Sequence, residues 1–114
     1  MIIRSSDRGN GAHDIRVRYY HPSTHVTVCL MRAGDDTARG ISICSLTEPA
    51  NAAKGRIKAK GRAVQALARR QDVDPIVRSE ALRALGDLQF IFGGMSKAAF
   101  NPKLFPMEAA LINY

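Results

Sequence analysis

Three short segments in which apolar and polar side chains alternate occupy the first part of the chain, and this alternation stops at Ser45. A period of two predicts a strand with one face on the core. The predicted strands are 14–21, 24–31 and 41–45, and the predicted turns between them are 21–23 and 33–40. We therefore expect the domain to begin with a three-stranded antiparallel meander.

After Ser45 the apolar residues follow a helical spacing. We expect a first helix through residues 52–70, with Thr47 as its cap and Pro49 near its first turn. Its sheet-facing side is predicted to hold Ala53, Ile57, Val64, Leu67 and Ala68. A glycine in a helix interior costs on the order of 1 kcal/mol. We expect Gly61 to let the helix lie close on the sheet and Gly55 to lie on its basic side.

A second helix is predicted from Asp74, its cap, through Pro75 to Phe92, because Gly93 and Gly94 follow directly. Its predicted buried residues are Ile76, Val77, Ala81, Leu85, Leu88 and Phe92. The fold class is therefore α+β: a three-stranded antiparallel sheet followed by two main helices and a short C-terminal helix at 106–111. We expect one domain over residues 1–114, with a mobile arm at 1–13.

The positive charge of the chain is concentrated in the first helix. The net charge is +7, and no Asp or Glu lies between Glu48 and Asp72. The basic residues of that window are Lys54, Arg56, Lys58, Lys60, Arg62, Arg69 and Arg70. Such a cluster is typical of a surface that contacts phosphates or another anionic partner. The alternative interpretation is a helix face that is merely solvated.

A second candidate surface lies on the first strand. Arg16, Arg18 and Tyr20 alternate with apolar residues, so that they share one face. On an exposed face of a sheet, arginines beside an aromatic ring can stack on bases or contact a protein. The alternative is packing of the arginine stems over tyrosine rings within the sheet.

The other reactive residues form no catalytic or metal-binding pattern. Cys29 and Cys44 have neither disulfide-framework nor zinc spacing, and no carboxylate or cysteine accompanies the three histidines at ligand spacing. Cys44-Ser45 would need a histidine base nearby to act as a nucleophile. The glycines near the lysines do not form a nucleotide-binding motif. We predict no metal, no cofactor and no enzymatic activity.

The stretch "RGISICS" followed by "KGRIKAKGRAVQALA", residues 39–68, resembles small phage-encoded accessory proteins. These proteins carry a Gly-x-x-x-Cys-Ser strand end before a Gly-Arg-rich helix. The resemblance implies a protein that acts stoichiometrically on host machinery, including nucleases, polymerases and CRISPR complexes. It carries no functional residues over to this chain, and it places the protein in the host cytoplasm.

Two functions follow from the basic helix and this resemblance. The first is a non-enzymatic accessory protein that binds nucleic acid or a nucleoprotein complex and so modulates host machinery. The alternative is a stoichiometric inhibitor, anti-CRISPR-like or otherwise directed at the host, that docks on an acidic protein surface. No stretch has the length for a signal peptide or a membrane span, so we expect a cytoplasmic protein without membrane contact.

The C-terminal segment carries more apolar surface than a free tail exposes to water. Its large apolar residues are Phe100, Leu104, Phe105, Met107, Leu111, Ile112 and Tyr114. The segment is expected to pack either on the rest of its own chain or on a twofold mate. The second alternative predicts a homodimer, which would present two basic helices to one long anionic partner.

Overall fold

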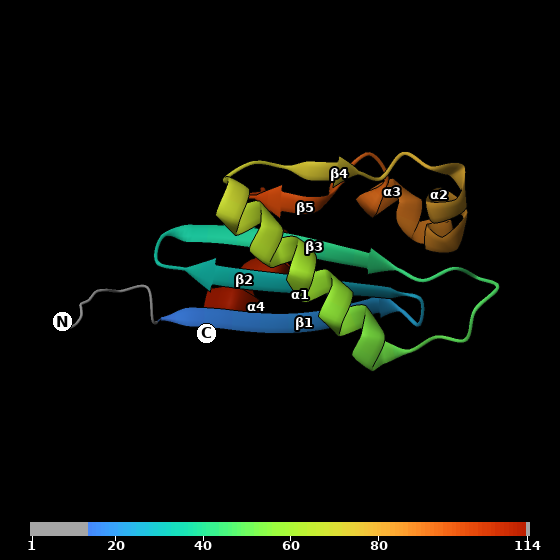
Figure 1. The fold of residues 1–114 in the computed structure, drawn as a ribbon, viewed down its shortest axis with the longest axis horizontal. Helices are drawn as coiled ribbons and strands as arrows, with labels where there is room; N and C mark the ends of the chain where they lie inside the picture. The colour runs from blue at the N-terminus through green and yellow to red at the C-terminus, as the bar shows by residue number, and fades with distance from the viewer. Residues whose placement is uncertain (1–13, 114) are drawn as a thin grey trace.

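The computed structural model describes residues 14–113, so the predicted arm at 1–13 lies outside the described residues. Its strands form one antiparallel sheet in the order β1-β2-β3-β5-β4 (Figure 1). They are β1 (Ile15–Ser23), β2 (Val26–Ala33), β3 (Asp36–Ile43), β4 (Val73–Pro75) and β5 (Ser96–Phe100). The α+β class and the meander of the first three strands are confirmed. The prediction of a three-stranded sheet is wrong, because β5 pairs with β3 and β4 pairs with β5.

The turn between β2 and β3 is shorter than predicted. Ala33 pairs with Asp36, so that only Gly34 and Asp35 form the loop. Gly34 has a φ of +62°, a left-handed conformation that glycine adopts at low cost. β3 therefore starts at Asp36 rather than at residue 41, and Arg39 becomes a strand residue.

Helix α1 (Ala52–Arg69) crosses one face of the sheet, in front of it in Figure 1. Its contact with the strands is made by small residues: Ala59, Ala63 and Ala66 are fully buried. Gly40 of β3 lies directly beneath the helix, where an added Cβ would be 1.9 Å from the carbonyl oxygen of Ala59. The helix backbone therefore lies unusually close to the sheet.

Three predictions about α1 are wrong in whole or in part. The cap is Asn51, whose side chain accepts a hydrogen bond from the backbone N–H of Lys54 at 3.0 Å, and not Thr47. Of the five residues predicted to face the sheet, only Leu67 packs on the core, whereas Ile57 is 73% exposed and Val64 is 46% exposed. The two glycines exchange roles as well. An added Cβ at Gly55 would meet the Thr27 hydroxyl at 2.5 Å, whereas an added Cβ at Gly61 would have nothing within 4 Å.

The predicted second helix is replaced by several short elements. Residues 73–75 form β4, and they are followed by α2 (Ser79–Leu85), the 3-10 turn η2 (Gly86–Leu88) and α3 (Gln89–Phe92). Asp74 has a φ of +62°, which an α-helical cap cannot adopt, and Gly86 breaks the helical run with a φ of +56°. Of the residues predicted to be buried, Ile76, Leu85 and Phe92 are buried, and Val77 is exposed.

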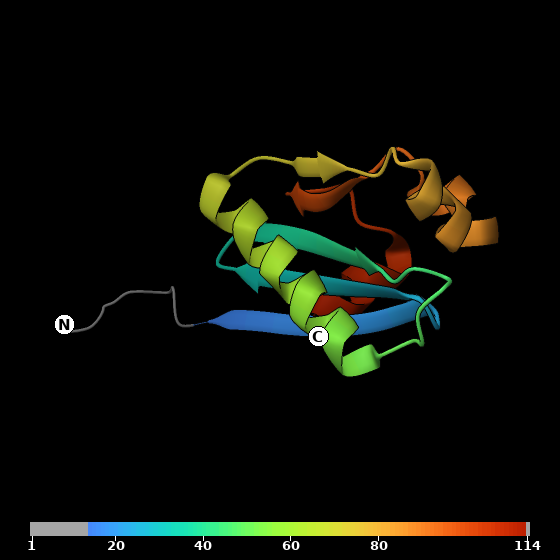
Figure 2. The same ribbon diagram turned by 45° about the vertical axis from the view of Figure 1, so that its right-hand side comes forward.

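The C-terminal segment covers the face of the sheet opposite α1, as Figure 2 shows. Helix α4 (Pro106–Asn113) confirms the short predicted helix, and its fully buried Ile112 belongs to a core cluster that includes residues of β2 and β3. Leu104, Phe105 and Leu111 pack on the same cluster. The sheet is thus covered on both faces, and the tail packs on its own chain. A homodimer stays a prediction. The tail is covered by its own chain, so its apolar residues no longer argue for a second copy.

Candidate binding surface

The side chains of α1 that point to solvent are basic and β-branched, because its alanine face is turned to the sheet. Five cations are exposed on this helix: Lys54, Arg56, Lys58, Lys60 and Arg69. Within residues 14–113, none of the five side chains forms a hydrogen bond or an ion pair. This part of the predicted basic surface is therefore available to a partner.

An apolar seam runs along the middle of this exposed face. It consists of Ile57, Gly61, Val64 and Ala68, at spacings of four, three and four residues. A helix turns by about 100° per residue, so these positions lie within one narrow sector. The same rotation places Lys54, Lys58 and Arg69 on one side of the seam and Arg56 and Lys60 on the other; we call these two sets the basic flanks. Together, the seam and the basic flanks form what we call the outer face of α1.

The other two predicted cations of the helix region are engaged within the fold. Nη1 of Arg62 donates to the backbone oxygen of Ile41 at 2.6 Å, and partial burial lowers the pKa of Arg62. Arg70 donates to Asp36 at 2.8 Å and lies over the ring of Phe100, 4.9 Å from its centroid. The hydrogen bond from Arg70 lowers the pKa of Asp36. Arg62 therefore holds the middle of α1 on the sheet, and Arg70 holds its C-terminal end.

The predicted surface on β1 is not brought together as a single exposed face. The phenol of Tyr20 points to the side of the sheet that α4 covers and donates to Glu108 at 2.7 Å. Burial raises the pKa of Tyr20 well above its ordinary value. Arg16 donates to the backbone oxygen of Ile112 at 3.3 Å, and Arg18 donates to that of Val17 at 3.0 Å. The expectation that Tyr20 stands exposed beside the two arginines is wrong.

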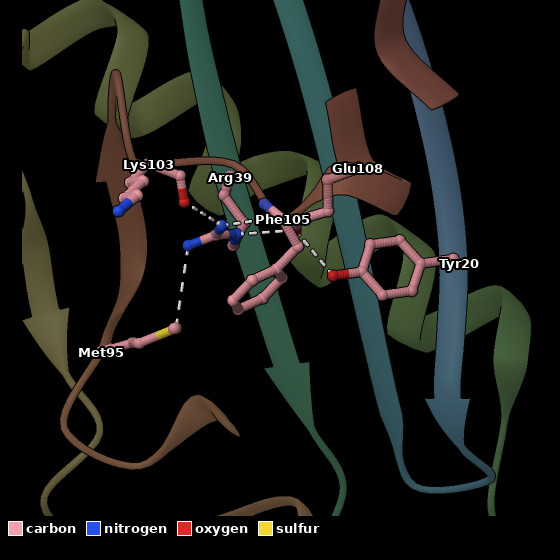
Figure 3. A network of polar contacts seen from close by, with 6 residues as sticks. All are labelled: Tyr20, Arg39, Met95, Lys103, Phe105 and Glu108. Carbon is pink, nitrogen blue, oxygen red and sulfur yellow. Dashed lines mark hydrogen bonds and ion pairs between the residues drawn. The ribbon is translucent and has the colours of Figure 1, made fainter. Parts of the chain in front are cut away.

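A buried ion pair between Arg39 and Glu108 holds α4 on the sheet (Figure 3). The guanidinium donates twice, from Nη2 to Oε1 at 2.5 Å and from Nε to Oε2 at 2.8 Å. Oε1 also accepts from the backbone N–H of Phe105 at 2.9 Å, and Oε2 accepts from the phenol of Tyr20. The bonds from Arg39 and Tyr20 connect the sheet to the first turn of α4, and the bond from Phe105 caps that turn.

Arg39 makes two further contacts beyond the carboxylate. Nη2 donates to the carbonyl of Lys103 at 3.1 Å, and Nη1 faces the sulfur of Met95 at 3.7 Å. The guanidinium lies 5.1 Å from the centroid of the Phe105 ring (Figure 3). The described partners of Arg39 and Glu108 all belong to this chain, so we interpret the network as structural and not as a ligand site.

Sequence analysis missed this network, although one local signal was present. Glu108 stands three residues after Phe105, with Pro106 between them at the first helical position. This is the second half of a capping box, in which a glutamate at the third position accepts from the N–H of the cap residue. The partner Arg39 lies 69 residues away in sequence, so that no local pattern could reveal it.

A hollow of about 640 Å³ lies between the end of β3 and the start of α1, next to Lys54 and Lys58 of the basic flanks. It is lined by Ser42, Ile43, Cys44, Ser45, Glu48, Pro49, Ala50, Asn51, Lys54, Gly55 and Lys58. The Cys44 thiol faces the carbonyl of Pro49 at 3.8 Å, and neither of the described histidines lines the hollow. The described lining thus offers no histidine base to the Cys44 thiol, and the hollow extends the polar, cationic surface of α1.

Neither of the described histidines takes part in a reactive arrangement. Nδ1 of His21 lies 3.2 Å from the hydroxyl of Thr27, and Nδ1 of His25 lies 3.1 Å from that of Thr24. Across residues 14–113, no group of histidine, cysteine and carboxylate side chains is placed to hold a metal ion. The third histidine, His13, lies outside the described residues.

Comparison with known proteins supplies no relative: no family model, no curated protein and no solved structure matches the chain. None of the described helices combines the length and apolar character that crossing a bilayer requires. The function is therefore argued from the outer face of α1.

Proposed function

We propose that the protein acts by binding, without turnover, and that the outer face of α1 is its docking surface for an anionic macromolecule. The observation that carries this proposal is the set of five exposed cations on one helix, none of them neutralised by a described side chain. The charge lies on a helix held tightly on the sheet, so it is presented on a rigid support. A partner would meet it without first ordering the helix.

Nucleic acid or a nucleoprotein complex is the first partner class. Lysines and arginines on one face neutralise phosphates without reading base sequence. By this proposal, together with the resemblance to small phage accessory proteins, the protein modulates nucleic-acid machinery in the host cytoplasm. Five phosphate contacts on B-DNA would make the logarithm of the affinity fall with the logarithm of salt at a slope of about 4.5.

An acidic surface of a host protein is the second class, and the apolar seam favours it. Ile57 and Val64 are exposed in the middle of the basic flanks, where a phosphate backbone offers them no apolar contact. A protein surface can match both the seam and the charges, as a stoichiometric inhibitor would require.

A salt titration on full-length protein separates the two classes. For the first class we expect duplex DNA or RNA to bind at physiological salt and to show the steep slope given above, measured by fluorescence anisotropy. For the second class we expect these nucleic acids to bind poorly and a host protein captured on the immobilised chain to show a shallower slope. If no anionic probe binds at any salt concentration, the proposed function is contradicted.

A further inference from the structure

We infer that the partner docked on the outer face of α1 is an acidic amphipathic helix of another protein. That helix would pack its own apolar stripe on the seam and place its carboxylates against the basic flanks. The inference rests on the proposed function, since it takes the outer face to be the docking surface. It adds the chemistry and the secondary structure of the partner.

The residues of the seam have the spacing found where one helix packs along another. Ile57, Gly61, Val64 and Ala68 repeat at four, three and four residues, which is the spacing of the contact positions of a coiled coil. They extend over about 16 Å of helix, or about three turns. The two large members are 73% and 46% exposed, so the chain itself leaves the seam largely uncovered.

Gly61 supplies an independent observation. It lies in the interior of an 18-residue helix, and an added Cβ there would touch nothing within 4 Å. No contact within residues 14–113 therefore explains a glycine at a position where alanine would stabilise the helix. A glycine between Ile57 and Val64 opens a hole into which a side chain of a second helix can insert, because interaxial distance depends on the side chains at the contact.

The positive charges on both sides of the seam favour a partner helix that carries carboxylates beside its apolar stripe. A helix with carboxylates flanking an apolar stripe places negative charge against Lys54, Lys58 and Arg69 on one side and against Arg56 and Lys60 on the other. A second copy of α1 would instead bring like charges together, which is unfavourable. The seam also has no side-chain donor or acceptor for base edges, so a DNA groove would leave its own polar groups unpaired.

The test uses the full chain and synthetic peptides of about three heptads. The first peptide has leucine at the contact positions and glutamate beside them. One control has the same composition with the leucines dispersed around the helix, and a second has lysine in place of glutamate. We expect the first peptide to bind and each control to bind at least about tenfold more weakly, which corresponds to the loss of one good buried contact or of charge complementarity.

Protein variants give the second arm of the test. Ile57→Ser with Val64→Ser should weaken binding of the acidic peptide by at least about tenfold. Gly61→Gln should also weaken it while leaving the melting temperature of the free protein equal or higher, because glutamine is a better helix former than glycine. Val77→Ser removes an apolar side chain of similar exposure outside α1, and it should leave peptide binding unchanged.

The other occupants are outcomes of the same assay, in which a duplex DNA and anionic phospholipid vesicles are tested beside the peptides. If either binds more tightly than the acidic peptide, and Lys58→Glu with Arg69→Glu abolishes that binding, the inference is overturned and the proposed function stands. The inference is also overturned if the Ile57→Ser, Val64→Ser variant binds the acidic peptide with the affinity of the wild-type protein. If the charge reversals change the binding of no probe, the inference and the proposed function both fail.

Discussion

Replacing Glu108 with alanine is expected to destabilise the fold by about 3–5 kcal/mol, because it leaves Arg39 as a buried charge without its partner. Both side chains are almost completely buried, and the carboxylate accepts four hydrogen bonds that connect β1, β3 and the first turn of α4. Losing it unpairs all four donors at once. Urea unfolding of the purified variant, followed by circular dichroism, measures the change.

Two further variants distinguish the lost charge partner from a general loss of packing. Tyr20→Phe removes one of the four hydrogen bonds and should cost only about 1–3 kcal/mol. Arg39→Met combined with Glu108→Leu removes both charges and should be clearly more stable than Glu108→Ala alone. A Glu108→Ala protein within 1 kcal/mol of the wild type would show that the network does not hold α4 on the sheet.

Gly40→Ala is expected to have the second largest effect, a loss of about 3 kcal/mol or more. Its Cβ would stand 1.9 Å from the carbonyl oxygen of Ala59 and 2.6 Å from the backbone nitrogen of Ala63. Backbone atoms cannot rotate away, so α1 would have to move off the sheet. The loss of stability should therefore exceed the usual loss from overpacking a core. Thermal unfolding of the variant measures this loss.

The same chemical change at Gly61 is the matched control. Gly61→Ala adds a methyl group in open space on the helix surface, and we expect it to raise stability by up to about 1 kcal/mol. Opposite signs for the two glycines would confirm the close approach of α1 to β3. Equal and small effects at both positions would contradict the packing described for this helix.

The first three strands could be predicted from the sequence because their alternation is local. The predicted turn before β3 was too long, because Thr37, Ala38 and Arg39 lack an apolar alternation even though they lie in the strand. β4 and β5 could not be predicted at all. They are three and five residues long, and they are strands only because β5 lies beside β3, a contact between segments about sixty residues apart.

The orientation of α1 was predicted wrongly for a physical reason. Hydropathy places Ile57 and Val64 inside, whereas close packing on Gly40 admits only small residues, so Ala59, Ala63 and Ala66 form the buried face. This error is informative about function. Most of the residues that look like a core face in the sequence lie on the side of the helix that we propose as the docking surface.

The candidate surface was predicted in part. Its five exposed cations all belong to the sequence-predicted set, because charge clustering is visible without a fold. Arg62 and Arg70 were predicted with them but make contacts within the fold, with the Ile41 carbonyl and the Asp36 carboxylate. Those contacts depend on where β3 lies relative to α1, which no local pattern specifies.

The most direct test of the proposed docking surface compares two charge-reversed variants of equal net charge. Lys58→Glu with Arg69→Glu alters the basic flanks, and Arg78→Glu with Arg83→Glu alters α2 and the residue before it, outside α1 (Figure 1). Each pair replaces two positive charges with two negative charges, so the net charge falls from +7 by four, to +3, in both.

The measurement is the dissociation constant of each variant for the tightest-binding probe among duplex DNA, RNA and the acidic peptide. We predict that the α1 variant binds about a hundredfold more weakly than wild type and that the α2 variant stays within about twofold. Equal losses in both variants would mean that binding follows net charge alone, and an unchanged α1 variant would mean that α1 is not the docking surface; either result contradicts the account.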